Sequence, residues 1–599
     1  MADNKKIKVG MVQINNSFDR QNYLPLSLGF LHSYAQKHAK NFNNFEFSMP
    51  IYKRIAIDEA VEHLSDSDIA CFSTYVWNFN ISSEIAKRLK KEKPETLIVF
   101  GGCHVPEPFI KEETYIEGKD ENYENYIRKG GIHNLEKKKM TIHNPQTSKL
   151  ENLEYTVYSH YDSKRDKGLK SFLERNSFID IASTGEGEMV FTSLLEKYPK
   201  REWDRVPGIH RLDEKGNLVS TFPQPRIEDL NTIPSPYLTD YFNQLMEKNA
   251  EEQWIALFET NRGCPFGCTF CDWGINAKNR MVLYDLEERI FKEIDWISKS
   301  KIEFVYCCDA NFGIYAAEKF KFRDLKIAQR FAENKGKYKY PHRFSVQNTK
   351  NSKEATYEIQ TILNDSGLDK GVLLAFQSLH EPTLKAIDRN NIRLETYHDL
   401  QKRFTKEGVT TFSDIILGLP LETYETFTKG VSTLIENGQH NRIQFNNLSI
   451  LPNAPIVGDI KKYGLEIAES DMINIHGSLG EWVDNIYERQ QLVVGTETMP
   501  REDWAKARNF GYMISFLHFD KVLQVPNILL NTQYGVSYKE ITDAFIENPR
   551  KTPIIEEISN LFSDQARSLQ KGGAEYIHSK QWLNIWWPAD EYALIKLAT

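Results

Sequence analysis

The sequence has few cysteines, no long hydrophobic run and no strong excess of charge of either sign. Seven cysteines in 599 residues, an odd count, do not form the dense disulfide framework of small secreted domains. No apolar stretch approaches the ~18 residues that a membrane-spanning helix needs. The formal net charge is −8, so no global field draws the chain to nucleic acid or anionic lipid. We therefore expect neither a membrane nor a nucleic-acid partner.

The N-terminal residues lack the features of a signal peptide. Met-Ala-Asp-Asn-Lys-Lys is followed directly by a short apolar segment that predicts a strand. The small number of cysteines also favours a reducing compartment, so we expect the protein in the cytoplasm. The length suggests two to four domains, and 40% hydrophobic residues are enough for sizeable cores.

The first part of the chain, residues 1–203, alternates short apolar strands with helical segments. Strands are predicted at 7–14, 69–72, 97–100 and 179–182, and helices at 24–38 and 81–91. This alternation, with glycines after the strands, predicts an α/β fold with an open, doubly wound parallel sheet of the Rossmann type. Ligands of such sheets lie beyond the carboxyl ends of the strands. The polar stretch 109–178 interrupts the pattern, and we interpret it as an insertion or lid with a solvated surface.

A second alternating block, residues 251–462, follows a connector at 204–250. Four prolines keep that connector extended. Six strands are predicted in the block, at 255–259, 304–307, 342–346, 371–376, 411–417 and 442–449. Strands with intervening helices predict a partial (β/α)6 barrel whose site lies at the C-terminal strand ends. Residues 463–599 are rich in aromatics at helical spacing and predict a small, mostly helical C-terminal cap.

Three cysteines directly follow the first strand of this barrel. Cys264, Cys268 and Cys271 stand at i, i+4 and i+7, and the flanking small residues Gly263 and Gly274 allow a tight loop around them. Three thiolates can hold three irons of a cubic four-iron cluster, which usually has four cysteines. The fourth iron then keeps an open position, as an open catalytic zinc does, and can bind a substrate and pass it an electron. Zinc with a distant fourth ligand, or three inert thiols, are the alternatives.

The spacing CxxxCxΦC, with Phe270 before the last cysteine, resembles the radical S-adenosylmethionine (SAM) enzymes. Further motifs resemble their cobalamin-binding subgroup. These are Leu-Asn-Thr-Ile-Pro at 230–234, Cys-Asp-Ala-Asn-Phe-Gly at 308–313, Phe-Gln-Ser at 376–378, Asp-Ile-Ile-Leu-Gly-Leu-Pro-Leu-Glu-Thr at 414–423 and Leu-Pro-Asn-Ala-Pro at 451–455. In the first domain, Ser73, Gly101-Gly102-Cys103-His104 and Gly185–Glu188 are similar to the subgroup's cobalamin domain. The resemblance covers residues 5–110 and 179–520.

Three departures from the subgroup's pattern stand out. Cys103 takes the place of a proline that is common between Gly-Gly and His, and Leu421 takes the place of a glycine. Leucine strongly favours φ below zero, so the turn at Leu421 is expected to differ. The Asp-x-His-x-x-Gly motif, by which other cobalamin proteins supply a histidine to cobalt, is absent. The lower axial position of cobalt is therefore not expected to carry such a histidine.

The resemblance implies three cofactors, a 4Fe-4S cluster, SAM and cobalamin, and a set of residues for each. The cluster ligands are Cys264, Cys268 and Cys271. The SAM contacts are Phe270, Asp309, Gln377, Ser378, Asp414, Gly418 and Leu451. The cobalamin contacts are Ser73, Tyr75, Trp77, Gly101, Gly102, His104, Gly185 and Glu186. Asp309 could instead cap the turn that follows it, Asp414 could be a buried structural carboxylate, and the glycines could serve ordinary strand-to-helix turns.

The resemblance also implies a reaction. One electron from the cluster, received from an external low-potential donor, cleaves SAM to methionine and a 5′-deoxyadenosyl radical, which abstracts hydrogen from an unreactive C–H bond. Methylcobalamin then methylates the carbon radical, so we predict a C-methyltransferase acting on a small molecule or a peptide. The alternatives are a cobalamin-dependent radical SAM enzyme that oxidises, cyclises or rearranges its substrate without methyl transfer, and a non-catalytic iron–sulfur redox sensor. No single catalytic side chain is predicted.

Overall fold

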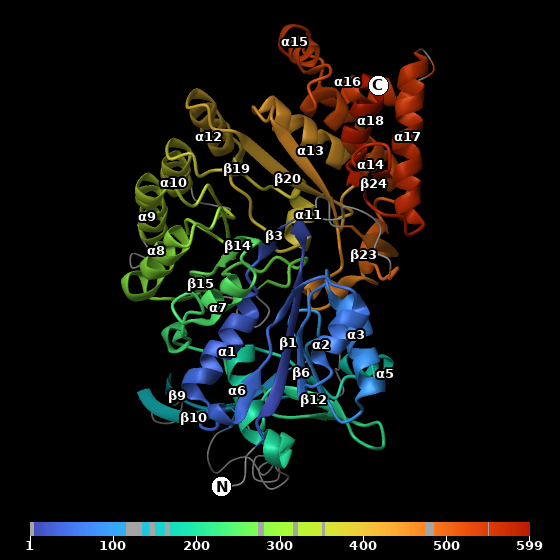
Figure 1. Cartoon of the computed structure of the whole chain (residues 1–599). Coiled ribbons are helices and arrows are strands. Elements are labelled where there is room, and N and C mark those ends of the chain that lie inside the picture. The colour runs from blue at the N-terminus through green and yellow to red at the C-terminus, as the bar shows by residue number, and fades with distance from the viewer. Residues whose placement is uncertain are drawn as a thin grey trace. The chain divides into compact units, whose positions relative to one another are not determined.

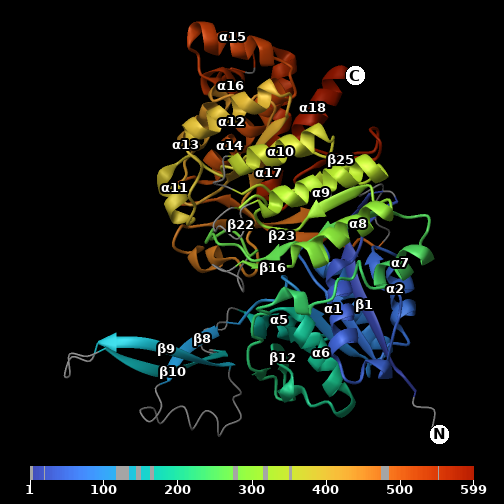
Figure 2. The ribbon, with the colours of Figure 1, turned by 90° about the vertical axis from the view of Figure 1, so that its left-hand side faces the viewer.

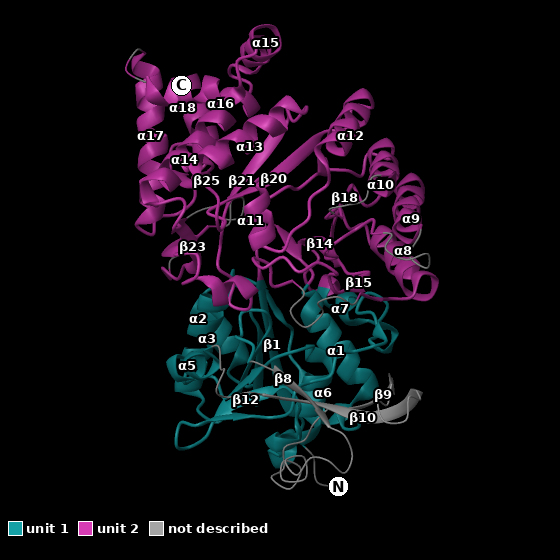
Figure 3. Cartoon of the chain, turned by 180° about the vertical axis from the view of Figure 1, so that it is seen from behind, with its two compact units in different colours: residues 1–14, 25–245 teal, residues 15–24, 246–599 magenta. Residues whose placement is uncertain are grey.

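The chain folds into two compact units. The fold is taken from a computed structural model that describes residues 5–18, 20–108, 110–115, 134–143, 150–161, 168–273, 281–314, 322–349, 354–473, 484–548, 550 and 552–599. Unit 1 comprises Met1–Ile14 and Pro25–Leu245, and unit 2 comprises Asn15–Leu24 and Met246–Thr599 (Figure 3).

Unit 1 is built on an eight-stranded sheet of short apolar strands. In β1 (Ile7–Asn15) the last seven residues are all buried, as expected for a strand covered on both faces. The other strands are β4 (Phe45–Phe47), β5 (Ile51–Lys53), β6 (Ile69–Ser73), β7 (Leu97–Gly101), β11 (Ile181–Ser183), β12 (Ile209–Leu212) and β13 (Leu218–Ser220). Their order is β13-β12-β11-β7-β6-β1-β4, with β5 also paired to β1. Strands β4, β1, β6, β7 and β11 are parallel, as predicted.

Helices cover both faces of this sheet. Helices α1 (Leu26–His38) and α6 (Gly187–Lys197) lie on one face, and α2 (Ile57–Leu64), α3 (Phe79–Glu92) and α5 (Leu169–Arg175) on the other (Figure 1). Counted along the chain, these strands lie side by side in the order 2-1-3-4-5 of a doubly wound sheet. Here β1 is strand 1, β4 and β5 take the place of strand 2, and β6, β7 and β11 are strands 3 to 5. The order reverses beside β1. Such sheets bind ligands outside the carboxyl ends of the two strands at this reversal, here β1 and β6.

Two stretches differ from the sequence-based expectations for this part of the chain. Residues 204–250 were expected to be an extended connector, but β12 and β13 form an antiparallel hairpin that lengthens the sheet beyond β11. A turn at Asp213–Gly216, with Gly216 at φ +73°, closes that hairpin. Helix α7 (Tyr241–Lys248) ends the stretch. Within the expected insertion at 109–178, β8 (Ile110–Tyr115), β9 (Asn134–His143) and β10 (Leu150–Tyr161) form a separate antiparallel sheet.

Unit 2 contains the six predicted strands of the second alternating block. They are β14 (Gln253–Phe258), β17 (Phe304–Cys307), β18 (Arg343–Ser345), β19 (Val372–Leu373), β20 (Thr411–Leu417) and β21 (Arg442–Asn447). Neighbours are parallel, but they belong to two sheets, one with β18-β17-β14 and one with β19-β20-β21. The strand expected at 371–376 is short, and a single bridge between Gln377 and Ile415 continues its pairing with β20.

The first sheet of unit 2 also receives a strand from the beginning of the chain. Strands β2 (Ser17–Phe18) and β3 (Gln21–Tyr23) extend it beyond β14, giving the order β18-β17-β14-β3-β2. β3 is parallel to β14, with Tyr23 opposite Ile255, and the Leu24 amide donates to the Ile255 carbonyl at 3.0 Å. These residues lie inside the region assigned to the first domain from the sequence. Their pairing partner lies far along the chain, so no local pattern indicates it.

The helices of unit 2 follow the strands and continue into the C-terminal region. α8 (Phe291–Lys299), α9 (Arg323–Tyr338), α10 (Glu354–Asp365) and α12 (Leu394–Lys406) lie side by side along the strands (Figure 2), and α11 (Glu381–Ala386) and α13 (Tyr424–Glu436) complete the alternation. The C-terminal region contains β22 (Glu466–Met472), β23 (Glu488–Gly495), α14 (Arg501–Ile514), α15 (Gln524–Tyr534), α16 (Tyr538–Glu547), α17 (Pro553–Gln570), β24 (Ile577–Ser579), β25 (Ile585–Trp587) and α18 (Ala589–Ala598).

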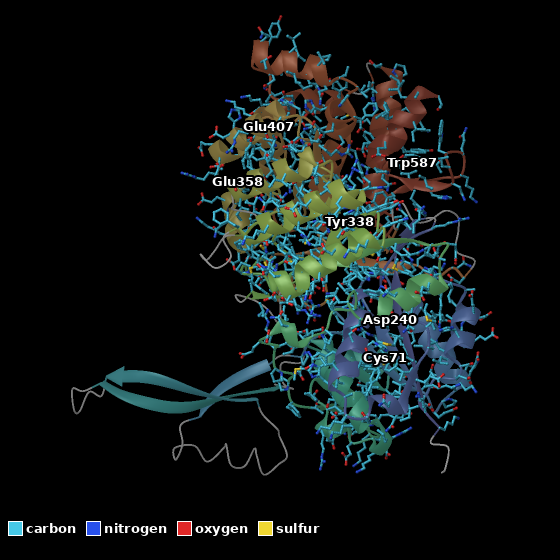
Figure 4. All side chains as sticks on the ribbon, turned by 60° about the vertical axis from the view of Figure 1, so that its left-hand side comes forward. Cys71, Asp240, Tyr338, Glu358, Glu407 and Trp587 are labelled. Carbon is cyan, nitrogen blue, oxygen red and sulfur yellow. The ribbon has the colours of Figure 1, made fainter. Side chains whose placement is uncertain are left out.

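This C-terminal region shares a hydrophobic core with the second half of the strands. Trp504 and Phe510 of α14 pack with Ile415 of β20 and Val431 of α13. The region is mostly helical, as predicted, and Trp504 and Phe510 are core residues, whereas Tyr534 is exposed. Among the helices that the structure describes, none is both long and apolar enough to cross a bilayer. Cys71, labelled in Figure 4, is a buried residue of β6 whose pKa burial raises to about 12, so it is a structural thiol.

Candidate cluster and cofactor sites

The cysteine loop, residues 263–271, leaves the carboxyl end of β14. A short antiparallel pair, β15 (Asn261–Arg262) with β16 (Val282–Leu283), closes its base. Gly263 has φ +111°, which lets the chain turn into the loop at its start. The loop therefore begins at the strand end where the site was predicted, and the three cysteines stand close enough that the charges of Cys264 and Cys268 act on Cys271.

A second segment, Ile387–Arg389, lies against this loop. The Thr269 amide donates to the Ile387 carbonyl at 3.0 Å. A Cβ added to Gly267 would meet the carboxyl group of Asp388, so a larger residue there would require that side chain to move. On the other side, the Ile456 amide donates to the Thr269 carbonyl at 2.8 Å. Both sides of the loop are thus held by backbone from later parts of unit 2.

The cysteines are free thiols with different exposure. Cys268 is buried, whereas Cys264 and Cys271 are half-buried. Burial raises the pKa of Cys271, so that thiol gives up its proton reluctantly until a metal takes its place. Across the described ranges, no three His, Cys, Asp or Glu side chains are gathered as a site for a single metal ion. A cubic cluster takes one thiolate on each iron.

Asp309 accepts hydrogen bonds from Thr260 and Asn261, which precede the cysteine loop. Its oxygens accept from the Thr260 amide at 2.8 Å, the Thr260 hydroxyl at 2.5 Å and the Asn261 amide at 3.2 Å. Arg323 adds bonds to the Thr260 hydroxyl and carbonyl at 2.8 and 2.9 Å. Burial raises the pKa of Asp309 to about 7. These contacts go to Thr260 and Asn261 and not to the turn that follows Asp309, and the contact of Asp309 with the SAM amine stays a prediction.

Gln377 follows β19, Asp414 lies in the middle of β20, and Glu422 lies in the turn after β20. One side-chain oxygen of each is buried without a hydrogen-bond partner in the part of the chain that the structure describes: Gln377 Oε1, Asp414 Oδ1 and Glu422 Oε2. Burial raises the pKa of Asp414 to about 6 and that of Glu422 to about 8. Buried acceptors without partners are costly, so these three fit a site that a polar ligand completes. Gln377 is held at φ +67° by bonds of its amide and carbonyl to β20.

Ser378 and Gly418 have partners inside unit 2. The Ser378 hydroxyl donates to Glu422 Oε1 at 2.5 Å and accepts from the His380 amide at 3.0 Å. Gly418 has φ +91°, and a Cβ there would lie 3.3 Å from the Val493 carbonyl and 3.4 Å from the Trp504 ring nitrogen. The close approach at Gly418 is therefore to β23 and α14 of the same unit.

Phe270 and Leu451, the two apolar residues predicted to pack on adenine, meet in one hydrophobic cluster. Both are partly buried against Ile387, Ile416 and Leu448. The structure thus brings the loop that carries the cysteines to the end of β20 and to the segment after β21. An apolar wall beside the cluster loop is what a purine would need for stacking.

Leu421 adopts the conformation of the glycine that it replaces. Its φ is +63°, in the left-handed region, and its side chain is 38% exposed. The expectation that the turn at Leu421 would differ from one formed by glycine is therefore wrong, because its φ is positive. Leu421 is strained in this turn, because the left-handed backbone conformation costs a leucine roughly 1–2 kcal/mol.

Two residues that sequence reasoning did not select contact the cysteine sulfurs. The Asn311 side-chain amide lies 3.2 Å from Cys264 Sγ. The Arg389 guanidinium lies near the Cys268 sulfur and is also close to Asp414 and Cys271. Asn311 stands in the motif at 308–313, which was a usable signal. Arg389 has no motif around it, and only the fold brings it to the loop.

In unit 1, Tyr75 and Trp77 follow β6 at the reversal of strand order. Their rings stack at 4.4 Å with an interplanar angle of 5°. Trp77 is 37% exposed, and the Tyr75 hydroxyl bonds Ser27 at 2.8 Å. Asn78 holds the turn, accepting from the Tyr75 amide at 2.7 Å and donating to the Ser73 carbonyl at 3.1 Å. An exposed aromatic face on a fixed turn fits a large flat ring such as a corrin.

The glycine pair after β7 approaches the same turn. Gly102 has φ +104°, and a Cβ there would lie 2.5 Å from the Thr74 carbonyl; a Cβ at Gly101 would lie 3.1 Å from the Ser183 hydroxyl. The His104 ring stacks on Phe79 at 4.1 Å, and burial lowers its pKa to about 4. His104 is therefore neutral at pH 7. The structure brings Ser73, Tyr75, Gly101, Gly102 and His104 together at one edge of the sheet.

Gly185 and Glu186 serve the local structure after β11. The Ile227 amide donates to Glu186 Oε2 at 2.5 Å, which ties the start of α6 to the stretch after β13. Gly185 has φ +82°, and a Cβ there would meet Gln224 at 3.4 Å. These are contacts of a strand-to-helix turn, and a role of either residue toward cobalamin stays a prediction.

Several known proteins are similar to this chain. A family model described as "Radical SAM superfamily" matches residues 258–432. The chain is 30% identical over 526 residues to the cobalamin-dependent radical SAM methyltransferase TokK of Streptomyces tokunonensis, covering 86% of this chain and 66% of that protein. It is also 30% identical over 523 residues to the 2-(S-pantetheinyl)-carbapenam-3-carboxylate methyltransferase of Streptantibioticus cattleyicolor, with the same coverage. The chain thus spans just under two thirds of the length of these relatives.

The fold is similar to that of a solved enzyme with two of the implied cofactors. The structure of the cobalamin-dependent SAM radical enzyme OxsB with aqua-cobalamin and SAM matches with a TM-score of 0.55 and 15% identity, covering 95% of this chain and 72% of that one. Members of the radical SAM family use a 4Fe-4S cluster and SAM, and the cysteine loop lies within the matched residues 258–432. This chain therefore carries a radical SAM domain and is similar, over 86% of its length, to cobalamin-dependent radical SAM methyltransferases.

Proposed function

We propose that this protein is a cobalamin-dependent radical SAM C-methyltransferase that methylates an unactivated carbon of a small molecule. The observation that carries the proposal is the cysteine loop at the end of β14, in the same unit as three buried oxygens without a hydrogen-bond partner among the described residues, in a chain whose two relatives above are both named methyltransferases. When bound, the cluster and SAM supply a 5′-deoxyadenosyl radical, and methylcobalamin supplies the methyl group.

We assign the cluster and SAM to unit 2, as a partial (β/α) barrel, and cobalamin to unit 1, as a Rossmann-like domain. In unit 2, Cys264, Cys268 and Cys271 would bind three irons. Gln377 Oε1 and Asp414 Oδ1 would accept from the polar groups of SAM, and their burial excludes water from that contact. Phe270 and Leu451 would pack on its adenine. In unit 1, the Tyr75–Trp77 pair would lie against the corrin.

The partners follow from the chemistry. A reduced cluster needs an external low-potential electron donor, and a reducing cytoplasm suits it. The relative from Streptantibioticus cattleyicolor is named for its action on 2-(S-pantetheinyl)-carbapenam-3-carboxylate, so that compound is the first substrate to test. The sheet at 110–161 and the C-terminal region are the stretches of the chain that we propose to shape the substrate site.

The test uses the full chain, reconstituted anaerobically with iron, sulfide and cobalamin, and incubated with SAM, titanium(III) citrate and the candidate substrate. We expect 5′-deoxyadenosine and S-adenosylhomocysteine together, with one deuterated methyl group in the product when methyl-deuterated SAM is used. The Cys264, Cys268 and Cys271 alanine variants lose SAM cleavage, whereas Cys103→Ala, an exposed thiol outside the loop, keeps it.

Each other outcome of this assay contradicts the proposal in a distinct way. 5′-Deoxyadenosine without S-adenosylhomocysteine would indicate radical chemistry without methyl transfer. A complete four-iron cluster that never cleaves SAM would indicate a redox sensor. Zinc in place of iron in anaerobically purified protein would remove the cluster altogether.

A further inference from the structure

Two side chains with nitrogen donors, Asn311 and Arg389, lie near two different cysteines of the cysteine loop. Asn311 Nδ2 lies 3.2 Å from Cys264 Sγ, and the Arg389 guanidinium lies near the sulfur of Cys268. Neither residue is among the proposed ligands of SAM. We propose that Asn311 and Arg389 are positioning residues of the cluster, which donate hydrogen bonds to its thiolates and set its reduction potential. This inference rests on the proposed function, because it requires the cluster to be present.

Asn311 is fixed on the loop that follows β17. It is 2% exposed, and the next residue, Phe312, is fully buried. The Phe312 amide donates to the Gln347 carbonyl at 2.7 Å, and its carbonyl accepts from the Thr349 amide at 3.0 Å. The two backbone bonds hold the loop on both sides of one residue. The amide group of Asn311 therefore points at Cys264 because its backbone is fixed.

Arg389 is fixed from two sides. Its Nη2 donates to the Ala375 carbonyl at 2.6 Å, and its Nε donates to the Phe376 carbonyl at 3.2 Å and to Asn391 Oδ1 at 2.8 Å. Those bonds anchor the guanidinium on the chain that leaves β19. The side chain is 5% exposed, so its charge is kept from water beside the sulfur.

The backbone before Arg389 holds the same loop that carries Cys268. The Ile387 carbonyl accepts from the Thr269 amide, and Asp388 lies against Gly267. Consecutive residues 387–389 thus contact consecutive residues of the cysteine loop. These contacts hold the segment that carries Arg389 against the segment that carries Cys268, so the guanidinium is kept near that sulfur.

The physical consequence is a shift of the one-electron equilibrium of the cluster. In that step one electron from an external reductant converts the oxidised 2+ cluster to the 1+ state, and no bond in the protein is made or broken. Hydrogen bonds to the sulfurs and a nearby positive charge both stabilise the more negative, reduced state. Burial strengthens the effect, because a low local dielectric screens it less. Removal of either donor is therefore expected to make reduction harder.

The experiment is a reductive titration of the reconstituted full chain, without substrate, followed by electron paramagnetic resonance of the 1+ cluster. The variants are Asn311→Leu, Arg389→Met and Arg389→Lys. For Asn311→Leu and Arg389→Met we expect at least a tenfold lower equilibrium constant of reduction, which is a shift of about −59 mV for a one-electron couple. Arg389→Lys keeps the charge but not the fork of donors, so its shift should be smaller. Iron and sulfide content should stay at the wild-type level in all three.

Two matched variants control for the loss of a buried polar side chain. Asn334→Leu removes a buried amide that bonds the Ile294 carbonyl and Asp295, and Arg289→Met removes a buried guanidinium that bonds Glu293. Both should keep the wild-type potential. A wild-type potential in fully iron-loaded Asn311→Leu and Arg389→Met would overturn the inference, and so would loss of iron from them, which would make these residues necessary for assembly. A wild-type protein that takes up no cluster would instead overturn the proposed function.

Discussion

The Ser378 hydroxyl donates a 2.5 Å hydrogen bond to the carboxyl group of Glu422, and both side chains are 1% exposed. Ser378 stands just beyond β19, and Glu422 stands in the turn between β20 and α13. The second oxygen of Glu422 has no hydrogen-bond partner among the described residues. This pair ties two strand ends of the proposed SAM site together through a carboxyl group that is kept neutral by burial.

The pair predicts a specific dependence of stability on pH. Burial raises the pKa of Glu422 from 4.5 to about 8, so between these values the unfolded chain is ionised while the folded chain holds the proton. Stability from this group is complete below pH 4.5 and is lost as pH rises toward 8. In urea unfolding, the wild type should lose of the order of a few kcal/mol more between pH 5 and pH 8 than Glu422→Gln does. Glu425→Gln, on an exposed side chain of α13, should follow the wild type; parallel profiles of wild type and Glu422→Gln would contradict the prediction.

The left-handed backbone of Leu421 predicts that glycine is the better residue there. Leu421→Gly should raise the free energy of unfolding by about 1 kcal/mol, because the strain of a side chain at φ +63° disappears. Leu421→Val should lower it, because β-branching makes that conformation still less favourable. Denaturant unfolding of the three proteins measures this. A glycine variant less stable than the valine variant would show that the leucine side chain stabilises the fold by contacts that outweigh its strain.

A comparison of alanine substitutions at Gly418 and Gly408 distinguishes the cost of backbone strain from the cost of close packing. Both have positive φ, +91° and +70°, but a Cβ at Gly418 would meet the Val493 carbonyl at 3.3 Å, whereas at Gly408 nothing lies within 4 Å. Gly408→Ala should cost only the conformational strain, about 1 kcal/mol. Gly418→Ala should cost the same plus the displacement of β23, reaching roughly 2–3 kcal/mol. Equal losses in the two variants would mean that β23 yields freely.

The exposed face of Trp77 predicts a measurable share of cobalamin affinity. Trp77→Ala should weaken binding of hydroxocobalamin by about tenfold, because stacking on an aromatic ring is lost (aromatic pairs contribute about 0.5–1.5 kcal/mol beyond area burial). Trp77→Phe should retain most of the affinity. Optical titration of the full chain with the cofactor gives both constants. Unchanged affinity in the alanine variant would place the corrin away from the Tyr75–Trp77 pair.

Short sequence patterns predicted those features of the fold and the candidate site that depend on neighbouring residues in the chain. The cysteine spacing, the buried apolar strands and the glycines after them stand within short stretches, and the structure has the strands where they were expected. Asn311 could have been found, because it lies in a motif already noticed. Arg389 could not, since its contact with Cys268 depends on how the segment after α11 packs against a loop from another part of the chain. The hairpin of β12 and β13 was missed because prolines on its flank dominated the pattern.

Strand β3 carries a consequence for biosynthesis. On the ribosome, Gln21–Tyr23 emerge long before Gln253–Ile255, the residues beside which they pair. The strand therefore stays without its partner while more than two hundred residues are added to the nascent chain. Closing so long a loop costs conformational entropy, which the packing of the folded unit must offset. A polypeptide translated from residue 246 onward would leave that edge of β14 unpaired, and bare edges attract other chains.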